Sequence, residues 1–415
     1  MRTINLTEGQ NSHHRLEQAE LAAVRSMEYV AIGLTLEVGT YELRPASNKV
    51  GALSCSGIQV LIHPKVAVSR LFWLMDFGQA KVAWRRAGLN FEEAPDLTSA
   101  IGHSFLMEAT RSLQQIVRGY VPSEDTSQVL RGRLSISRQV QRHMGVPIPM
   151  EIEYDDFIAN VTENRILLAA AEKCLRIPTL SAPDRLMCRA LVGRLESSGV
   201  RSAQPGEIWR VTKLNQHYRR SLHLAELILK SESFALRSGG AAASGFVIDM
   251  WMIFEDFVVE WLRGYFDPKQ VSVSCQYSFV LDEERQFKPR ADLYLSTSDI
   301  GVFVDAKYKG LGRGQPPMSD VYQMQSYCIA AKSTVAHLIY VGSESSSSYT
   351  LNNSGVTVHR HSIDLSAESE VLDAQLKQIA ALIAADLGVQ SGSATPTANP
   401  LGDHRLAAQS LTAHR

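Results

Sequence analysis

The segment Val302–Tyr308 is an apolar, strand-like run that contains two charged residues, Asp305 and Lys307. Side chains alternate along a strand, so these two charges share one face while the apolar residues beside them point toward a core. Charged groups in such a strand are costly unless they are paired. The run therefore predicts a buried strand that brings a carboxylate and an ammonium group to a common site.

A second strand is predicted just upstream, at Ala291–Ser296, and it carries Asp292. If the two strands pair, Asp292 joins Asp305 and Lys307. Two carboxylates can hold Mg²⁺, a hard cation that prefers oxygen ligands, and the bound ion polarises a phosphate and lowers the pKa of water. Lys307 can position or help to deprotonate the attacking water and stabilise transition-state charge. The three residues predict metal-dependent hydrolysis of phosphodiesters, with both aspartates as metal ligands.

An acid-x-Lys triplet alone is weak evidence, because a second one, Asp267–Lys269, occurs at an apparent turn that has no apolar strand. The alternative for Asp305 and Lys307 is a structural ion pair at a strand end. The apolar strand around them, the upstream strand and a helix expected at Asp320–Ala331 favour the catalytic interpretation.

Two further residues are candidates for the same site. Gln323 and Tyr327 are four positions apart on the downstream helix and face the same way. Gln323 could orient the water or a phosphate, or it could be a surface amide. Glu255 lies in the amphipathic helix expected at Phe246–Leu262. It is a candidate third metal ligand, and the alternative is an acid on the polar face of the helix.

The chain has 415 residues, of which 45% are hydrophobic, and this length indicates two or three domains. The expected fold class is α+β multidomain. We expect a small β-rich domain at 1–75, a mainly helical middle domain at 76–243, an α/β nuclease domain at 244–388 and a disordered tail at 389–415. The small residues at 239–245 read as a linker.

Local patterns predict individual elements. Residues 1–15 are polar and expected to be disordered. Residues 41–66 alternate like strands, with Ser56-Gly57 as the turn between the last two. Helices are expected in the middle domain at Ser99–Arg118, Glu163–Leu175 and Leu214–Leu229. In the last domain the other expected strands are Val271–Leu281, Gly301–Tyr308 and Val335–Val341.

Charge and cysteine content limit the possible functions. Lys plus Arg total 42 against 43 for Asp plus Glu, a formal net charge of -1. Strong DNA binding by the chain alone would usually need a basic protein. The locally basic stretch Arg131–His143 is either a solvated helix face or a contact to DNA or a partner. Five scattered cysteines, no secretory leader and no membrane-length apolar run predict a reduced, cytoplasmic protein.

The site segment resembles the PD-(D/E)xK nuclease superfamily, with Asp292 as the first acid and Asp305-Ala306-Lys307 as the second half. More narrowly, the chain resembles the McrC family, the nuclease subunits of McrBC modification-dependent restriction systems. Arg290-Ala291, rather than Pro, directly precedes the first acid, a variation that leaves the role of the acid intact. The other resembling segments are Ile58–Val66, Leu130–Leu134, Tyr154–Phe157, Thr162–Leu167, Phe254–Phe257 and Tyr322–Tyr327.

This resemblance implies a Mg²⁺-dependent endonuclease of double-stranded DNA that works with a McrB-like AAA+ GTPase hexamer. It also implies that the N-terminal region docks in the pore of the ring and stimulates GTP hydrolysis. The chain has no phosphate-binding Gly-x-x-x-x-Gly-Lys-Ser/Thr loop, and the nearest stretch, Gly240–Gly245, lacks the lysine, so we expect that it does not bind GTP itself. Two alternatives are a stand-alone repair or mobile-element nuclease of the same superfamily and a non-catalytic adaptor that activates an AAA+ ring.

Overall fold

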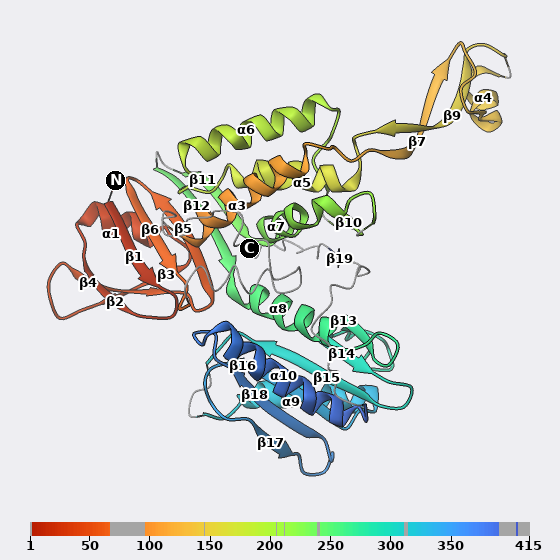
Figure 1. The fold of residues 1–415 in the computed structure, drawn as a ribbon. Helices are drawn as coiled ribbons and strands as arrows, with labels where there is room; N and C mark the ends of the chain where they lie inside the picture. Colours follow the sequence, from red (N-terminus) through yellow and green to blue (C-terminus); the bar gives the residue numbers. More distant parts are fainter. Residues whose placement is uncertain are drawn as a thin grey trace. The chain divides into compact units, whose positions relative to one another are not determined.

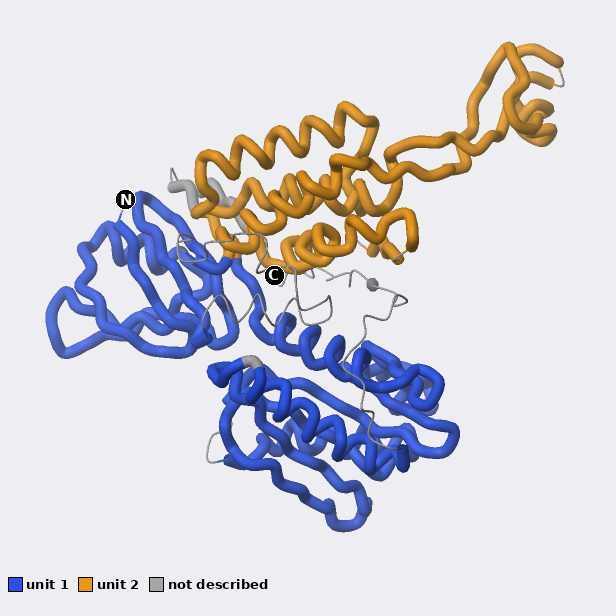
Figure 2. The backbone as a smooth tube through the Cα atoms, in the orientation of Figure 1, with its two compact units in different colours: residues 1–97, 247–399 blue, residues 98–246, 400–415 orange. Residues whose placement is uncertain are grey.

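The computed structural model describes residues 2–66, 96–144, 146–204, 206–210, 212–238, 241–310, 314–389 and 404–405. The chain divides into two compact units (Figure 2). Unit 1 consists of Met1–Leu97 and Val247–Asn399, and unit 2 consists of Thr98–Phe246 and Pro400–Arg415. The N-terminal part therefore belongs to the same unit as the C-terminal domain. The boundary expected near residue 75 and most of the tail expected after residue 388 lie outside the described residues.

In the N-terminal part of unit 1, strands β1, β6 and β5 lie next to one another in that order within a larger sheet. The strands are β1 (Arg2–Thr7), β6 (Ile58–His63) and β5 (Lys49–Cys55). The last two form a hairpin whose two-residue turn has positive φ at Ser56 (46°) and Gly57 (83°), as a tight right-twisted hairpin requires. The predicted turn is confirmed.

The expectation that residues 1–15 are disordered is wrong. Strand β1 pairs in parallel with β6, and its alternate residues Ile4 and Leu6 are both buried. Two alternating apolar residues are too few to predict a strand from local sequence. The strand forms because it pairs with β6, which lies more than fifty positions away in the sequence. A second sheet has the order β2-β4-β3, with helix α1 (Gln18–Arg25) nearby in sequence. Its strands are β2 (Ser12–Arg15), β4 (Thr40–Pro45) and β3 (Val30–Leu34).

Unit 2 is mainly helical, as the sequence predicts (Figure 1). Its helices are α3 (Leu97–Ser112), α5 (Thr162–Cys174), α6 (Ala182–Ser197), the short η2 (Gln216–Tyr218) and α7 (Arg219–Lys230). Its short strands are β10 (Ile208–Trp209), which pairs with β19 (His404–Arg405), and β11 (Glu232–Ser238). The linker expected at 239–245 is not a linker from residue 241 onward, because Ala241–Asp249 forms strand β12.

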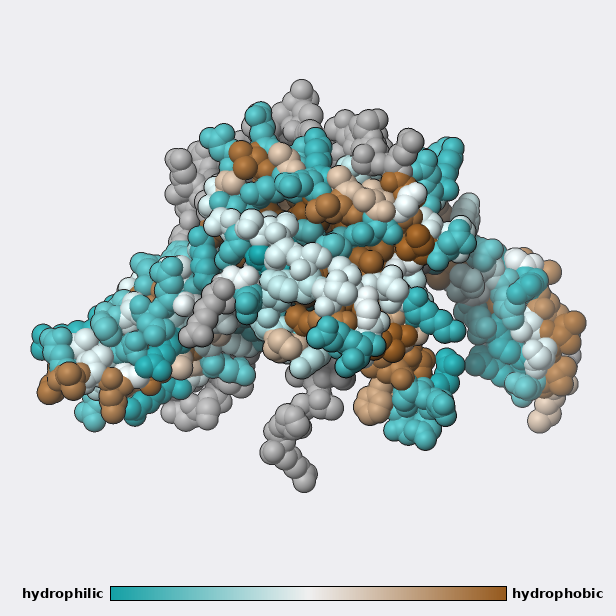
Figure 3. All heavy atoms as spheres, turned by 90° about the horizontal axis from the view of Figure 1, so that it is seen from below, coloured by the Kyte–Doolittle hydropathy of each residue, from teal (hydrophilic) through white to brown (hydrophobic). Residues whose placement is uncertain are grey.

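An arm of two long antiparallel strands, β7 (Gly119–Ser127) and β9 (Met150–Ile158), extends from these helices and carries β8 (Arg133–Leu134) and α4 (Ile136–His143). Gly132 has φ +75°, and a Cβ there would lie 2.2 Å from the carbonyl oxygen of Glu153, so the motif around it requires glycine. Figure 3 shows apolar side chains gathered at the arm. The exposed ones include Val129, Leu130, Leu134, Ile136, Val140, Met144, Val146 and Ile148.

The basic stretch of the arm is paired with acids of the same arm. Arg133 lies 2.9 Å from Glu153, and Arg142 and His143 lie 3.2 Å and 3.0 Å from Glu151. Arg131 and Arg138 also form ion pairs with acids of β7 and β9. These local pairs favour a structural role for the stretch over a free basic surface.

The C-terminal domain of unit 1 is built on a six-stranded mixed sheet with the order β13-β14-β15-β16-β18-β17. The first three strands are antiparallel, whereas β15, β16 and β18 run parallel. The strands are β13 (Ser272–Ser278), β14 (Arg290–Ser296), β15 (Gly301–Lys307), β16 (Val335–Val341), β17 (Ser347–Thr350) and β18 (Thr357–Ile363). The first four match predicted strands, while β17 and β18 were not predicted.

Three helices accompany this sheet: α8 (Met250–Tyr265), α9 (Met318–Ala331) and α10 (Ser369–Asp386). Helix α8 begins at Met250 rather than Phe246, because residues 246–249 complete β12. Phe303, Leu338 and Tyr340 form the sheet side of a core that Met324 and Tyr327 of α9 complete. Across the described parts of the chain, no helix has the length and apolar character needed to cross a membrane.

Candidate active site

Strands β14 and β15 place Asp292 and Asp305 side by side. Leu293 pairs with Val304 in the antiparallel ladder, so the preceding Asp292 lies opposite Asp305. The Oδ2 atom of Asp292 accepts a hydrogen bond of 2.9 Å from the backbone N–H of Ala306. Asp305 is 1% exposed. The register of one hairpin therefore gathers the two predicted carboxylates in a buried position.

Lys307 extends from the same face of β15, as the alternation predicts. Its Nζ lies 2.6 Å from Oδ2 of Asp305 and donates to Oε1 of Gln323 at 3.2 Å. The side-chain amide of Gln323 in turn donates to the hydroxyl of Tyr327 at 2.8 Å. Gln323 is half-buried and held from both ends. The structure therefore places it in the cluster and not as a surface amide.

Glu255 enters the cluster from helix α8. It is 9% exposed, its side chain is hydrogen bonded to Asp292, and its Oε1 accepts a hydrogen bond from Gln276. Gln276 has φ +49° in the middle of β13, a conformation that is rare for residues other than glycine. Its neighbours Cys275 and Tyr277 pair with β14, so Gln276 lies opposite Asp292. Such local strain is typical of functional sites.

Burial and mutual repulsion shift the acids of the cluster toward their neutral forms. Burial, and then the charge of Asp305, raise the pKa of Asp292 from 3.8 to about 7. Burial also raises the pKa of Asp305, against the opposing effect of Lys307. Burial disfavours the charged form of Lys307. The nearby charges of Asp305 and Asp292 have the larger combined effect, so the pKa of Lys307 is raised. The ammonium therefore stays charged at neutral pH, while the aspartates lack enough positive charge around them.

The raised pKa of Asp292 predicts a pH-dependent stability in chelating buffer. The stability that its bound proton contributes is fully present below the ordinary pKa of 3.8 and is lost as the pH rises through about 7. We expect the unfolding midpoint to fall over this window, and to fall less in Asp292→Asn, which never ionises. Urea unfolding of both proteins across the window measures the difference, and equal slopes would contradict the assignment.

The donor set fits a hard divalent cation. Oδ2 of Asp305 is buried, and the ammonium of Lys307 lies 2.6 Å from it. One ammonium does not balance the charges of two neighbouring, largely buried aspartates, whose pKa values are both raised. The converging ligands of Asp292, Asp305 and Glu255 are all carboxylate oxygens, which Mg²⁺ prefers.

The sequence reasoning missed a neighbouring network at the end of the same sheet face. Asp320, in the first turn of α9, accepts a hydrogen bond of 2.7 Å from the hydroxyl of Tyr340 and lies 2.8 Å from Nζ of Lys309. Its charge contributes to the raised pKa of Asp305. Tyr340 pairs in register with Lys307 on the next parallel strand. Only the pairing of β15 with β16 reveals this relation, since the two residues are far apart in the sequence.

The residue after Lys307 connects the cluster to the N-terminal sheet. Tyr308 donates a hydrogen bond of 2.6 Å to Oε1 of Glu8, which also accepts the backbone N–H of Lys65 at 3.1 Å. Glu8 is 0% exposed. The N-terminal part of unit 1 is therefore tied to the end of the strand that carries Asp305 and Lys307.

We expect Tyr308→Phe to destabilise unit 1 by about 1–3 kcal/mol, because a buried acceptor loses its donor. Thermal unfolding of the variant and the parent measures the shift. Tyr322→Phe is the matched control, since Tyr322 is 60% exposed. Equal losses in the two variants would show that the contact with Glu8 contributes nothing.

Comparisons with known proteins identify relatives of the chain. Residues 45–341 match the family model described as “McrBC 5-methylcytosine restriction system component”. No curated protein matches the chain.

Solved structures that are similar to the chain include two McrB–McrC assemblies. One is a chain of a refined half-complex from a tetradecameric assembly of Thermococcus gammatolerans McrB AAA+ hexamers with bound McrC. It is 17% identical, with a TM-score of 0.51, and the match covers 92% of this chain and 100% of that chain. The other is a chain of the cryo-EM structure of the Thermococcus gammatolerans McrBC complex, with 21% identity, a TM-score of 0.43 and coverage of 63% and 87%. The first likeness shows a common fold. Because the family model spans most of its residues, the chain belongs to the McrBC 5-methylcytosine restriction system component family.

Proposed function

We propose that the chain is the Mg²⁺-dependent DNA endonuclease subunit of a McrBC-like, GTP-dependent and modification-dependent restriction complex. In this proposal it hydrolyses DNA phosphodiesters and stimulates a McrB-like AAA+ GTPase. The observation that carries the proposal is the convergence of two acidic side chains, Asp292 and Asp305, with the ammonium of Lys307 in a largely buried cluster. Membership of the restriction family supplies the biological context.

Asp292 and Asp305 would hold the ion, with Glu255 as a third carboxylate. When bound, Mg²⁺ polarises the phosphate, lowers the pKa of a water molecule and neutralises developing charge. Burial, and then repulsion from neighbouring carboxylates, raise the pKa values of the two aspartates, and a divalent cation between them would favour their charged forms. Protons and Mg²⁺ compete for the same carboxylate oxygens, so the affinity for Mg²⁺ would increase as the pH rises.

Lys307 would supply the positive charge that the protein itself brings to the reaction. Because its pKa is raised, it acts as a hydrogen-bond donor to the attacking water or to a phosphate oxygen, rather than as a base. Gln323 holds the ammonium by accepting a hydrogen bond from Nζ, and Tyr327 holds the amide of Gln323. Gln323 is therefore a positioning residue in this mechanism. Fixing such groups before the reaction removes the need to order them during it.

The partner would supply what the chain lacks. With a formal net charge of -1, the chain has no overall electrostatic attraction to DNA, so a partner that delivers the DNA fits its composition. The similar solved structure contains McrB AAA+ hexamers with bound McrC. We infer that a McrB-like GTPase plays that part here, that the N-terminal region engages its ring, and that this chain binds no GTP. The contact between Glu8 and Tyr308 would then link the docking region to the strand of the nuclease site.

A reconstituted cleavage assay tests the proposal. The full chain is combined with the McrB-like GTPase and plasmid DNA that contains 5-methylcytosine, and GTP, Mg²⁺ and the partner are each omitted in turn. We expect cutting only when all three are present, together with faster GTP hydrolysis than by the GTPase alone. Cutting by the chain without any NTPase would identify a stand-alone nuclease. Stimulated GTP hydrolysis without cutting on any modified DNA would identify an adaptor.

A further inference from the structure

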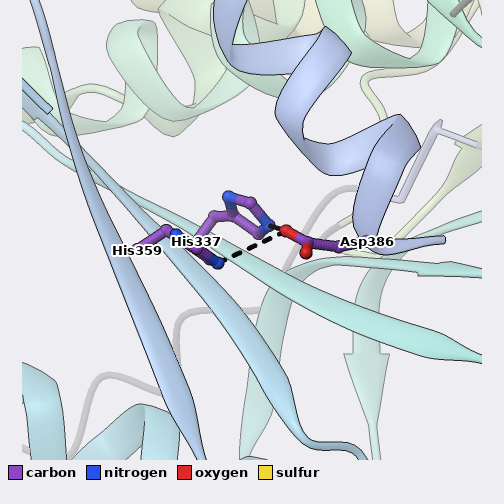
Figure 4. Close-up of side chains that lie close together, drawn as sticks. All are labelled: His337, His359 and Asp386. Atoms are coloured by element: carbon purple, nitrogen blue, oxygen red, sulfur yellow. Dashed lines mark ion pairs between the residues drawn. The ribbon is translucent and has the colours of Figure 1, made fainter. Parts of the chain in front are cut away.

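Three histidines and an aspartate gather on the face of the nuclease sheet opposite to Asp305 and Lys307. His337 of β16 pairs in register with His359 of β18, and His361 follows two positions later on the same face. Figure 4 shows the imidazoles of His337 and His359 turned toward the carboxylate of Asp386, which extends from the end of α10. His337 is 0% exposed. The nuclease mechanism uses none of these groups.

The distances among these side chains are those of metal ligands. Oδ2 of Asp386 lies 3.1 Å from Nε2 of His337 and 3.4 Å from Nε2 of His359. Neighbouring ligand atoms of a tetrahedral zinc ion are about 3.3–3.4 Å apart when the metal–ligand bonds are about 2.0–2.1 Å long. One donor atom from each of the three residues lies within 4.8 Å of the others. Little movement would therefore bring all three atoms into one coordination sphere.

The buried Nε2 nitrogen of His337 faces the carboxylate of Asp386. It lies 3.1 Å from Oδ2, an interaction that lowers the pKa of Asp386, but the angles are poor for a hydrogen bond. A fully buried polar atom with a poorly aligned partner is a position where an ion or a water molecule would improve the contacts. The same atom is the donor that points at the centre of the cluster.

The other ring nitrogen of His337, Nδ1, has a hydrogen-bond partner of the kind that surrounds metal-binding histidines. Nδ1 of His337 lies 2.9 Å from Nε2 of His361, and Nδ1 of His361 lies 3.1 Å from Oγ of Ser346. If His337 donates from Nδ1 to His361, and His361 donates from Nδ1 to Ser346, every hydrogen bond is satisfied and Nε2 of His337 keeps its lone pair free. Metal-binding histidines are oriented in this way by a partner on the second nitrogen.

The position of Asp386 at a helix end also favours a bound cation. Helix α10 ends at this residue, so its carboxylate lies at the negative end of the helix dipole. The contact with His337 and the other histidines lower the pKa of Asp386, so the carboxylate is held in the charged form that binds a cation.

We propose that His337, His359 and Asp386 bind a zinc ion that fastens the C-terminal end of α10 to strands β16 and β18. Two imidazole nitrogens with one carboxylate favour zinc or a similar transition metal over Mg²⁺, which prefers an all-oxygen set. Water would complete the coordination, and His361 positions His337 without binding the ion. The role is structural, and it is independent of the proposed nuclease function.

Zinc content and zinc-dependent stability of the full chain test this site. The protein is purified with a tag that contains no histidine, dialysed with excess Mg²⁺ to occupy carboxylate sites, and analysed by elemental mass spectrometry. We expect one zinc per chain, and a thermal unfolding midpoint that chelation lowers and zinc restores. Replacement by Co²⁺ should give the visible absorption of a four-coordinate site with nitrogen ligands.

The variants His359→Gln and Asp386→Asn should lose the zinc, the Co²⁺ absorption and the stabilisation. His359 is chosen because its side chain is partly exposed (21%), so the change leaves the core intact. The matched control is His103→Gln, which breaks another His–Asp pair, at 2.8 Å, that has no third ligand nearby in the described structure. Asp305→Asn should keep the zinc, which separates this site from the nuclease site.

Zinc that binds more weakly than about 10 μM, or that persists undiminished in both ligand variants, would overturn the proposal. In the first case the cluster is a metal-free His–Asp network, and in the second the zinc belongs elsewhere. Because the readouts are metal content, absorption and stability, either result is independent of whether the chain cuts DNA.

Discussion

Replacing Asp305 with Asn is expected to reduce the rate of DNA cleavage by about a thousandfold or more. The variant should lose several kcal/mol of metal-supported transition-state stabilisation, and each ~1.36 kcal/mol lowers the rate about tenfold. Asp305 is the most buried of the converging acids, and its Oδ2 forms the ion pair with Lys307. The amide keeps the shape of the side chain but removes the charge that would hold Mg²⁺. Cleavage of 5-methylcytosine-containing plasmid with the partner GTPase, GTP and Mg²⁺ measures the effect.

The same variant should fold at least as well as the parent protein. Burial raises the pKa of Asp305, so its charge costs the folded chain stability when no metal is bound. GTPase stimulation should also persist, because the docking region is unchanged. Asp299→Asn is the matched control, an exposed acid between the same two strands. Restriction that survives in Asp305→Asn at the parental level would refute the catalytic assignment and favour an adaptor.

The second large effect is expected at Lys307. Lys307→Met should lower the cleavage rate by about 10²–10⁴-fold, the range associated with a positioned proton-transfer or charge-stabilising group. The methionine keeps most of the length of the side chain but cannot donate to water or phosphate. Mg²⁺ binding, followed by calorimetry, should remain, since the carboxylates are intact. Loss of metal binding together with cutting would show that Lys307 acts through the architecture of the site and not in the reaction.

Two further variants make the assignment of Lys307 sharper. Gln323→Leu removes the acceptor that holds Nζ and should cause a smaller loss, because the ammonium remains but is less well fixed. Lys288→Met changes an exposed lysine of the same domain and should have little effect. If Lys288→Met reduced cutting as much as Lys307→Met, general positive charge near the DNA would explain both losses.

The chain's organisation suggests how a partner could influence the site. The N-terminal sheets and the six-stranded C-terminal sheet belong to one compact unit, although unit 2 separates them in the sequence. The hydrogen bond from Tyr308 to Glu8 crosses between these two parts of unit 1, one residue from Lys307. A change imposed on the N-terminal part therefore has a short covalent and hydrogen-bonded path to strand β15.

Local sequence was enough to find the main elements of the candidate site. The alternation in Val302–Tyr308 and the apolar pattern of Ala291–Ser296 predicted β15 and β14, and with them the shared face of Asp305 and Lys307. Alternation is a property of the strand backbone itself, so it is readable without knowledge of the partner strand. The helical rhythm likewise placed Gln323 on α9, which the structure brings to Lys307.

What the sequence could not supply were relations between distant segments. Strand β1 exists because β6 offers it a parallel partner, and Tyr340 reaches the Asp305 face because β16 pairs with β15. Neither the left-handed backbone of Gln276 nor the cluster of His337 and Asp386 has a local signature. The sequence by itself determined which side chains share a face of each strand, because that follows from backbone geometry. Only the tertiary structure decided which faces and strand ends meet, because non-local pairing and burial fix those choices.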